Sequence, residues 1–293
     1  MTATRSKSEN LAAGIGWMLA TMCLFTSMDT VAKYLTLRFN IEQVVWARFT
    51  FHILFLVIWL RSRLFKLAIT SNWKLQLVRS ACLLLTTTLF FNGLHTTPIT
   101  TASTIMFLSP VLVTVLAIPL LGEQVGIRRW LGIAIGLLGA LVIIRPGASN
   151  GVAIGHLFLI GAAFSNAFYQ IATRQVRATD DPMTSLLYSG LVGAILMSAT
   201  VSGEWTQPDA FGWGLFMVMG LLGAVSHFCL IRAFNSAEAS AIVPFSYSSL
   251  LWATLFGFLI FDTLPDRWTL LGAALIVSSG LYIFHREQLR TNQ

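Results

Sequence analysis

Long apolar runs separated by short polar stretches cover almost the whole chain. Each run is close to the roughly 20 residues that a helix needs to cross the hydrocarbon core of a bilayer. The runs are continuous and do not show the apolar–polar alternation of outer-membrane barrel strands. The pattern therefore predicts an all-α polytopic membrane protein with ten transmembrane helices, near residues 11–31, 44–60, 75–94, 100–121, 130–145, 152–172, 184–201, 211–231, 240–261 and 269–285.

The second half of the chain repeats the first. At an offset of 137 residues Phe91 matches Phe228, and at an offset of 139 residues Gly16 matches Gly155. Each half holds five runs, an odd number, so the second half enters the membrane with the opposite polarity. We therefore predict two inverted five-helix repeats, between a tail at either end of the chain: tail 1–10, first repeat 11–145, second repeat 152–285 and tail 286–293.

Composition and charge agree with lipid as the solvent. Only 11% of the residues are charged, against about 25% in soluble domains. If the N-terminus is cytoplasmic, 14 of the 19 lysines and arginines fall in inner segments and 5 in outer ones. By the positive-inside rule both termini are then cytoplasmic. The basic clusters lack the aromatic platform of a nucleic-acid reader, so we expect no nucleic-acid partner. The three cysteines have no metal-binding spacing, and we expect no metal.

Several local features are similar to the EamA-type members of the drug/metabolite transporter superfamily, whose chains carry two EamA domains. Residues 25–34 (FTSMDTVAKY) are followed by Trp46-Ala47-Arg48-Phe49, and Gly122-Glu123 closes the fourth run before a glycine-rich fifth run. The resemblance covers about residues 11–285, with one departure at Asp262, where the second copy more commonly has Glu. It implies a carrier of small organic solutes, either driven by an ion gradient or facilitative. We expect Glu123 and Asp262, at the ends of runs, to cap or gate.

Glycines are spaced by three or four residues in the fifth run (Gly132, Gly136, Gly139), and Gly272 and Gly280 lie in the tenth. Small residues at such spacing allow helix backbones to approach closely in lipid. The pattern predicts a packing seam within the scaffold or the face of a homodimer.

Ionisable side chains inside the runs are the first candidates for a site, because a charge at a helix centre costs about 2.5–3.5 kcal/mol on insertion scales. Asp29 and Lys33 lie four residues apart and share a helix face. They could form a local ion pair, an outer gate, or a site for the charged ends of a zwitterion. Arg48 could pair with Asp29 or clamp a carboxylate with its planar guanidinium.

Two histidines and three amides are further candidates. His52, four residues from Arg48, could relay a proton or be a satisfied buried histidine, and His227 could pack or bind a ligand. A proton is therefore a candidate coupling ion. Asn92 lies toward the outer end of the third run. Asn166 and Gln170, four apart in the sixth run, could form a hydrogen-bonding wall or join helices to one another.

Prolines interrupt the fourth and ninth runs at Pro110 and Pro244. A proline frees a carbonyl and allows a kink, and interrupted helices border the sites of many transporters. Ser109, Tyr247 and Trp252 flank these positions. The two aromatic side chains could stack on a planar ligand or could simply face lipid or core.

Together these features predict a secondary transporter that moves a small organic metabolite, amino-acid-like or aromatic and heterocyclic, by alternating access in the cytoplasmic (inner) membrane. Its partners would be the bilayer and a small-molecule substrate. No phosphate-binding loop G-x-x-x-x-G-K-[ST] is present, and we expect neither ATP nor another cofactor. An intramembrane enzyme or lipid-acting protein is an alternative, as is a membrane scaffold that transports nothing.

Overall fold

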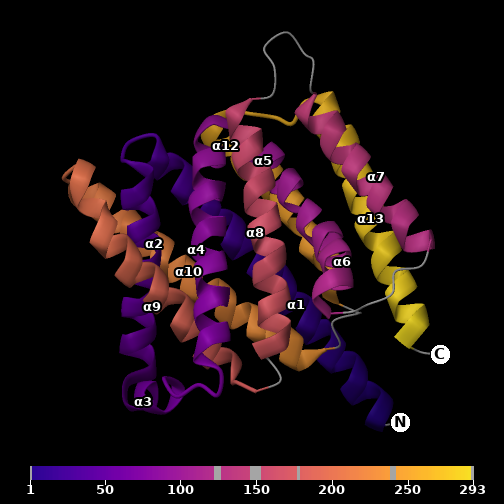
Figure 1. Cartoon of the computed structure of the whole chain (residues 1–293), viewed down its shortest axis with the longest axis horizontal. Helices are drawn as coiled ribbons and strands as arrows, with labels where there is room; N and C mark the ends of the chain where they lie inside the picture. Colours follow the sequence, from indigo (N-terminus) through magenta and orange to yellow (C-terminus); the bar gives the residue numbers. More distant parts are fainter. Residues whose placement is uncertain (1, 122–126, 146–152, 177–178, 238–241, 292–293) are drawn as a thin grey trace.

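A computed structural model describes residues 2–121, 127–145, 153–176, 179–237 and 242–291. Within these ranges every regular element is an α-helix or a 3₁₀ helix (Figure 1). The elements of the first half are α1 (Thr2–Thr36), α2 (Ile41–Leu60), η1 (Arg61–Arg63), α3 (Leu64–Leu67), α4 (Trp73–Thr96), α5 (Ile99–Met106), α6 (Leu108–Leu121) and α7 (Ile127–Ile144). Those of the second half are α8 (Ile154–Val176), α9 (Pro182–Thr200), η2 (Val201–Glu204), α10 (Ala210–Ser236), η3 (Val243–Ser248), α12 (Ser249–Phe261) and α13 (Arg267–Thr291).

The prediction of an all-helical, multi-pass membrane protein is confirmed. Among the described residues, 8 helical stretches are long and apolar enough to cross a membrane, and Trp130–Ile144 is a shorter apolar helix. The bundle also presents large apolar side chains on its surface, as lipid contact requires. Examples are Ile58, Leu138, Ile195 and Leu259. Both chain ends lie at the same end of the bundle (Figure 1). The count of ten spanning helices and the cytoplasmic side of the termini stay predictions.

Short polar side chains start many of the helices. The side chains of Asn72, Asp181 and Asp209 accept hydrogen bonds from the backbone N–H of a residue two or three positions further on. Each such bond satisfies an N–H group that has no partner within its helix. At the other end of a helix, Asp262 follows α12 with a φ of 50°, in the left-handed conformation that closes many helices. Asp262 is thus a backbone cap, while Glu123 lies outside the described residues.

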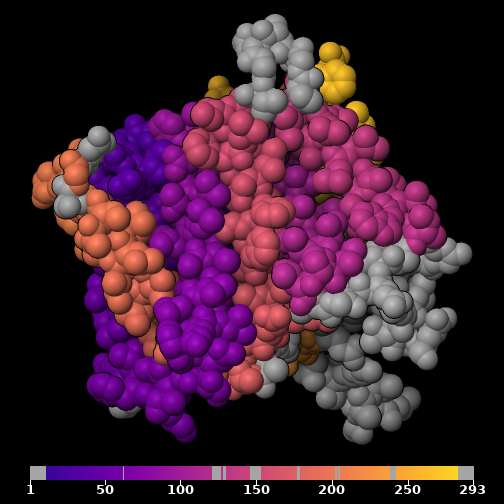
Figure 2. All heavy atoms as spheres, viewed as in Figure 1, coloured from indigo at the N-terminus to yellow at the C-terminus, as the bar shows by residue number. Residues whose placement is uncertain are grey.

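The most extensive helix contacts join the two halves of the chain. α1 packs against α10 and α4 packs against α8, so the first helix of each half lies on the third helix of the other. α7 and α13, the last helix of each half, also pack together along one edge of the bundle (Figure 1). α4 and α8 run side by side on the face that Figure 2 shows. This reciprocal arrangement is the one that two inverted repeats produce about a pseudo-two-fold axis.

The predicted glycine seam lies inside the chain, between α7 and α13. A Cβ on Gly272 would stand 2.6 Å from the carbonyl oxygen of Gly139, and one on Gly139 would stand 2.9 Å from that of Gly272. The Ser279 hydroxyl donates to the carbonyl oxygen of Gly132 across the same contact, at 2.5 Å. These residues therefore serve packing within the chain, and a homodimer stays a prediction.

Both predicted helix interruptions are visible. The fourth run divides at Phe107, which separates α5 from α6, and Pro110 lies in the first turn of α6. In the first turn of a helix a backbone N–H has no acceptor within the helix, so the missing N–H of proline costs no hydrogen bond there. In the ninth run Pro244 lies near the start of the 3₁₀ helix η3, which leads into α12. The interruptions meet in space, because the rings of Phe107 and Tyr247 lie 4.8 Å apart between centroids, at 40°.

Candidate functional site

The centre of the candidate site is formed by Asp29 on α1 and Arg48 on α2. The two side chains interact electrostatically, and both are partly exposed although they lie within the helical bundle. Arg48 donates a hydrogen bond to the Thr87 hydroxyl on α4, and its guanidinium lies 4.9 Å from the ring centroid of Phe49. The structure thus brings together the acidic and basic side chains that the sequence placed on neighbouring helices.

Lys33 does not pair with Asp29. Its Nζ donates to the backbone carbonyls of Leu94 and Thr97, at 2.8 Å each, and stands 5.5 Å from the ring centroid of Phe261. These carbonyls lie at the end of α4, where a helix leaves acceptors unmet and where a cation is favoured. Lys33 is therefore a buried cap that ties α1 to the end of α4. The expected alternative of a local ion pair with Asp29 is wrong for this conformation.

His52 and His227 lie beside Arg48. Their rings are nearly perpendicular, with centroids 5.9 Å apart, and His227 also meets the ring of Phe25 edge to face at 5.0 Å. His52 is 7% exposed, and its Nε2 has no hydrogen-bond partner among the described residues. Arg48, His52 and His227 line a narrow cavity with Phe49, Leu83, Ser189 and Gly190. The cavity has room for about one water molecule.

A polar wall joins α8 to the interrupted fourth run. The side-chain amides of Asn166 and Gln170 both donate to the hydroxyl of Ser109, at 3.1 and 3.0 Å. Asn166 and Gln170, four residues apart on α8, therefore share one acceptor, the Ser109 hydroxyl of the first repeat. Asn92, by contrast, donates to the carbonyl of Thr88 in its own helix, at 2.7 Å, and is not part of this wall.

The remaining candidates lie apart from the charged pair. Pro110 is exposed on the outside of α6, and Pro244 is half-buried in η3. Trp252 stacks on Phe256, four residues along the same helix, at 6.1 Å between centroids. Tyr247, besides meeting Phe107, places its hydroxyl against Gly280 of α13, where a Cβ would collide with it.

Sequence reasoning missed Arg79, which is one of the 14 basic residues that the charge count assigned to inner segments. The side chain is only 4% exposed, and its guanidinium lies 4.7 Å from the ring centroid of Tyr169. Its donors reach only neutral groups of α8 and α9: Thr173 Oγ1 (2.7 Å), the Ser185 carbonyl (2.8 Å), Ser189 Oγ (2.7 Å) and Tyr169 Oη (2.8 Å). The sequence held a signal for this, because these partners form two pairs spaced four apart on helix faces.

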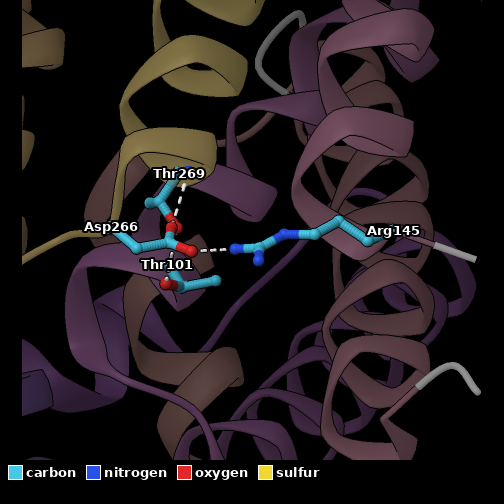
Figure 3. A network of polar contacts seen from close by, with 4 residues as sticks. All are labelled: Thr101, Arg145, Asp266 and Thr269. Carbon is cyan, nitrogen blue, oxygen red and sulfur yellow. Dashed lines mark hydrogen bonds and ion pairs between the residues drawn. The ribbon is translucent and has the colours of Figure 1, made fainter. Parts of the chain in front are cut away.

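Polar networks tie the ends of the bundle. Arg145, after α7, forms an ion pair with Asp266, which caps α13 by accepting from the Thr269 N–H at 2.8 Å (Figure 3). The Thr269 hydroxyl meets that of Thr101 on α5, at 3.2 Å. Elsewhere, Asp180 in the α8–α9 loop accepts from the Gln76 side chain and the Ser71 N–H. These contacts hold the scaffold around the site.

Comparison with known proteins identifies the family. The model of the EamA-like transporter family matches residues 12–145 and again residues 153–284. The chain belongs to the EamA-like transporter family. It therefore carries two EamA repeats, and the prediction from the sequence features is confirmed.

Curated relatives of this EamA protein span nearly its full length. It is 29% identical to an S-adenosylmethionine uptake transporter of Rickettsia conorii, over 96% of this chain and 95% of the relative. It is 26% identical to a riboflavin transporter of Vibrio cholerae, with the same coverage. A solved crystal structure shares the fold, with a TM-score of 0.65, 17% identity, and coverage of 92% of this chain and 96% of the other. The protein is thus a small-metabolite transporter and not an enzyme, and the inner membrane fits a bacterial transporter of this family.

Proposed function

We propose that this EamA protein is a secondary carrier of a small amino-acid-like solute and that it works by alternating access. The observation that carries the proposal is the Asp29–Arg48 pair, an acid and a base held inside the bundle, both partly exposed. Charged groups at this depth are costly and mark substrate or ion pathways in membrane proteins. An acid beside a base matches the ammonium and carboxylate of an amino-acid zwitterion.

Two other features of the bundle suit a solute that also carries a flat ring. The side-chain amides of Asn166 and Gln170, which donate to the Ser109 hydroxyl, offer neutral hydrogen-bonding groups. The Phe107–Tyr247 contact offers aromatic faces at the two helix interruptions. S-adenosylmethionine, the cargo named for the Rickettsia conorii relative, combines an amino-acid group with a purine. It is the first substrate to test, and riboflavin, a heterocycle without an amino-acid group, is the second.

The reciprocal contacts support alternating access. Because α1 lies on α10 and α4 lies on α8, each half contributes walls to both ends of the central space. Rocking one half against the other would close one end as it opens the other. With both termini in the cytoplasm, Lys33 would lie toward the outer end and Arg79 toward the inner end. In a proton-driven cycle, one of the titratable side chains of the site would carry the coupling proton.

Uptake into proteoliposomes tests the proposal. Labelled S-adenosylmethionine, riboflavin and a set of amino acids would be offered with and without a pH gradient. We expect saturable uptake of at least one solute, and loss of most of it in Asp29→Asn and Arg48→Gln. Matched controls are Asp262→Asn, at a left-handed cap that asparagine also favours, and Arg63→Gln, at an exposed arginine. A protein that moves nothing in this panel, or whose transport ignores both central substitutions, contradicts the proposal.

A further inference from the structure

The interior of the bundle holds an excess of positive charge. In the described part of the chain, the acidic and basic side chains that lie within spanning helices and are not exposed are Asp29, Lys33, Arg48 and Arg79. Three are cations and one is a carboxylate. Charges taken out of water need a partner of opposite sign or a full set of hydrogen bonds.

Two of the three cations are satisfied by neutral groups. Lys33 is held by backbone carbonyls, and Arg79 by hydroxyls and one carbonyl, and both are buried. Arg48 is different, because it is partly exposed and among the described hydrogen bonds it donates only to the Thr87 hydroxyl. A guanidinium has five N–H donors in a planar fork that fits a carboxylate through two parallel bonds. Arg48 is therefore the cation placed to meet an anionic group of a ligand.

Tyr169 contacts Arg79 directly. Its ring stacks on the Arg79 guanidinium, and its hydroxyl oxygen accepts from Arg79 Nη2 at 2.8 Å. It also interacts electrostatically with Arg48. Because the oxygen accepts from Arg79, the hydroxyl proton is directed away from that arginine and can be donated to another group.

A second observation marks the same place as a ligand site. His52 is more than nine-tenths buried, its Nε2 lacks a hydrogen-bond partner among the described residues, and it lines the narrow cavity beside Arg48. Ser189, which Arg79 holds at 2.7 Å, lines the same cavity. A buried polar atom without a partner calls for an explanation, and either a water or one polar group of a ligand in this small cavity supplies it.

We propose that Arg48 and Tyr169 bind a carboxylate of the transported solute, and that Arg79 is a positioning residue that orients Tyr169. The inference rests on the proposed function, and it narrows the cargo to solutes that carry a carboxylate. Asp29 then meets the ammonium of the same solute. A heterocycle without a carboxylate, such as riboflavin, is a poor ligand because it offers no anionic group to the unused N–H donors of Arg48.

The probes are S-adenosylmethionine and its decarboxylated analogue, which keeps the adenosyl, sulfonium and ammonium groups. Binding to the purified full-length protein would be measured by calorimetry. We expect the analogue to bind the unaltered protein about tenfold or more weakly, as loss of a charged hydrogen-bonded pair requires. Tyr169→Phe and Arg79→Lys should weaken the binding of S-adenosylmethionine and leave the binding of the analogue nearly unchanged. The preference of the protein for S-adenosylmethionine over the analogue should therefore shrink. Tyr188→Phe, which removes a hydroxyl bound to the Ala68 carbonyl, is the matched control.

The ratio of the two affinities separates a positioning role from a purely structural one, because general destabilisation weakens both probes alike. If Arg79→Lys fails to fold, Tyr169→Phe carries the test alone. Equal binding of the two probes to the unaltered protein would overturn the inference, as would an unchanged preference in Tyr169→Phe. Transport of riboflavin with no carboxylate-bearing solute moved overturns the inference and leaves the carrier function standing. A protein that moves no solute contradicts the proposed function itself.

Discussion

Phe107 and Tyr247 lie against each other, 4.8 Å apart between ring centroids, at the points where the fourth and ninth runs of the chain are interrupted. One residue belongs to each repeat, so the contact joins the two halves where each helix can bend. In the proposed alternating-access cycle, this contact would lie where the two halves move against each other.

The hydroxyl of Tyr247 makes Gly280 indispensable. A Cβ at this position would collide with the hydroxyl oxygen, while the next atom of the ring, Cζ, lies 3.2 Å away. We expect Gly280→Ala to lower thermal stability in detergent, and Tyr247→Phe to recover a large part of that loss in the double variant. Differential scanning fluorimetry over the four combinations measures the coupling, which should be about 0.5–3 kcal/mol for residues in contact. Additive effects would show that the hydroxyl moves away freely.

The α7–α13 seam should tolerate an added methyl group poorly. A Cβ on Gly272 meets backbone, the Gly139 carbonyl at 2.6 Å, which no side-chain rotation relieves. Gly272→Ala should therefore destabilise by about 1–3 kcal/mol. Gly214→Ala is the control, because nothing lies within 4 Å of its Cβ and alanine is the better helix former. Thermal unfolding of both variants checks this, and equal stabilities would contradict the close approach of the two helices.

Lys33 should act on stability independently of Asp29. Lys33→Ala leaves two backbone carbonyls without their donor, which we expect to cost about 1–3 kcal/mol. Because the two side chains form no ion pair, the effects of Lys33→Ala and Asp29→Asn should add to within about 0.5 kcal/mol in unfolding measurements. A larger interaction energy would show that Lys33 and Asp29 form the ion pair that the sequence suggested.

Asp180 should make the α8–α9 loop and the segment before α4 sensitive to acid. Partial burial raises the pKa of its carboxyl group, but hydrogen bonds from Thr70, Gln76 and Ser71 together outweigh burial and lower the pKa below the usual 3.8. A carboxylate with a lowered pKa stabilises the fold at pH values above its unfolded pKa, and this contribution disappears as the pH falls through the folded value. The difference in melting temperature between the unaltered protein and Asp180→Asn should thus be constant from pH 5 to 8 and shrink below about pH 4. A difference that grows on acidification would be incompatible with these hydrogen bonds.

Local patterns predicted a good part of the site. Asn166 and Gln170 share a helix face because residues four apart always do, and the sequence showed that spacing directly. Their acceptor, Ser109, was a candidate on separate grounds, its place beside a proline. What no spacing could show is that all three meet, because that depends on α6 lying on α8.

Arg79 and Lys33 show where prediction from sequence stopped. Arg79 lies near the start of its apolar run, where a basic residue ordinarily marks a cytoplasmic loop. Arg79 is buried only because α8 and α9 pack around it and supply its hydrogen-bond acceptors. Lys33 has Asp29 one turn away, but the end of α4 offers it two carbonyls at 2.8 Å.

The sequence by itself determined the helical membrane class, the duplication and the interruptions near Pro110 and Pro244. These properties depend on neighbours a few residues away or on the repeat itself, through hydrophobic length and the missing N–H of proline. Only the tertiary structure decided which charges meet, so that Arg48 interacts electrostatically with Asp29 while Lys33 and Arg79 find neutral partners. Partner choice depends on contacts between helices far apart in the chain, and a buried charge accepts whichever acceptors that packing brings within hydrogen-bonding distance.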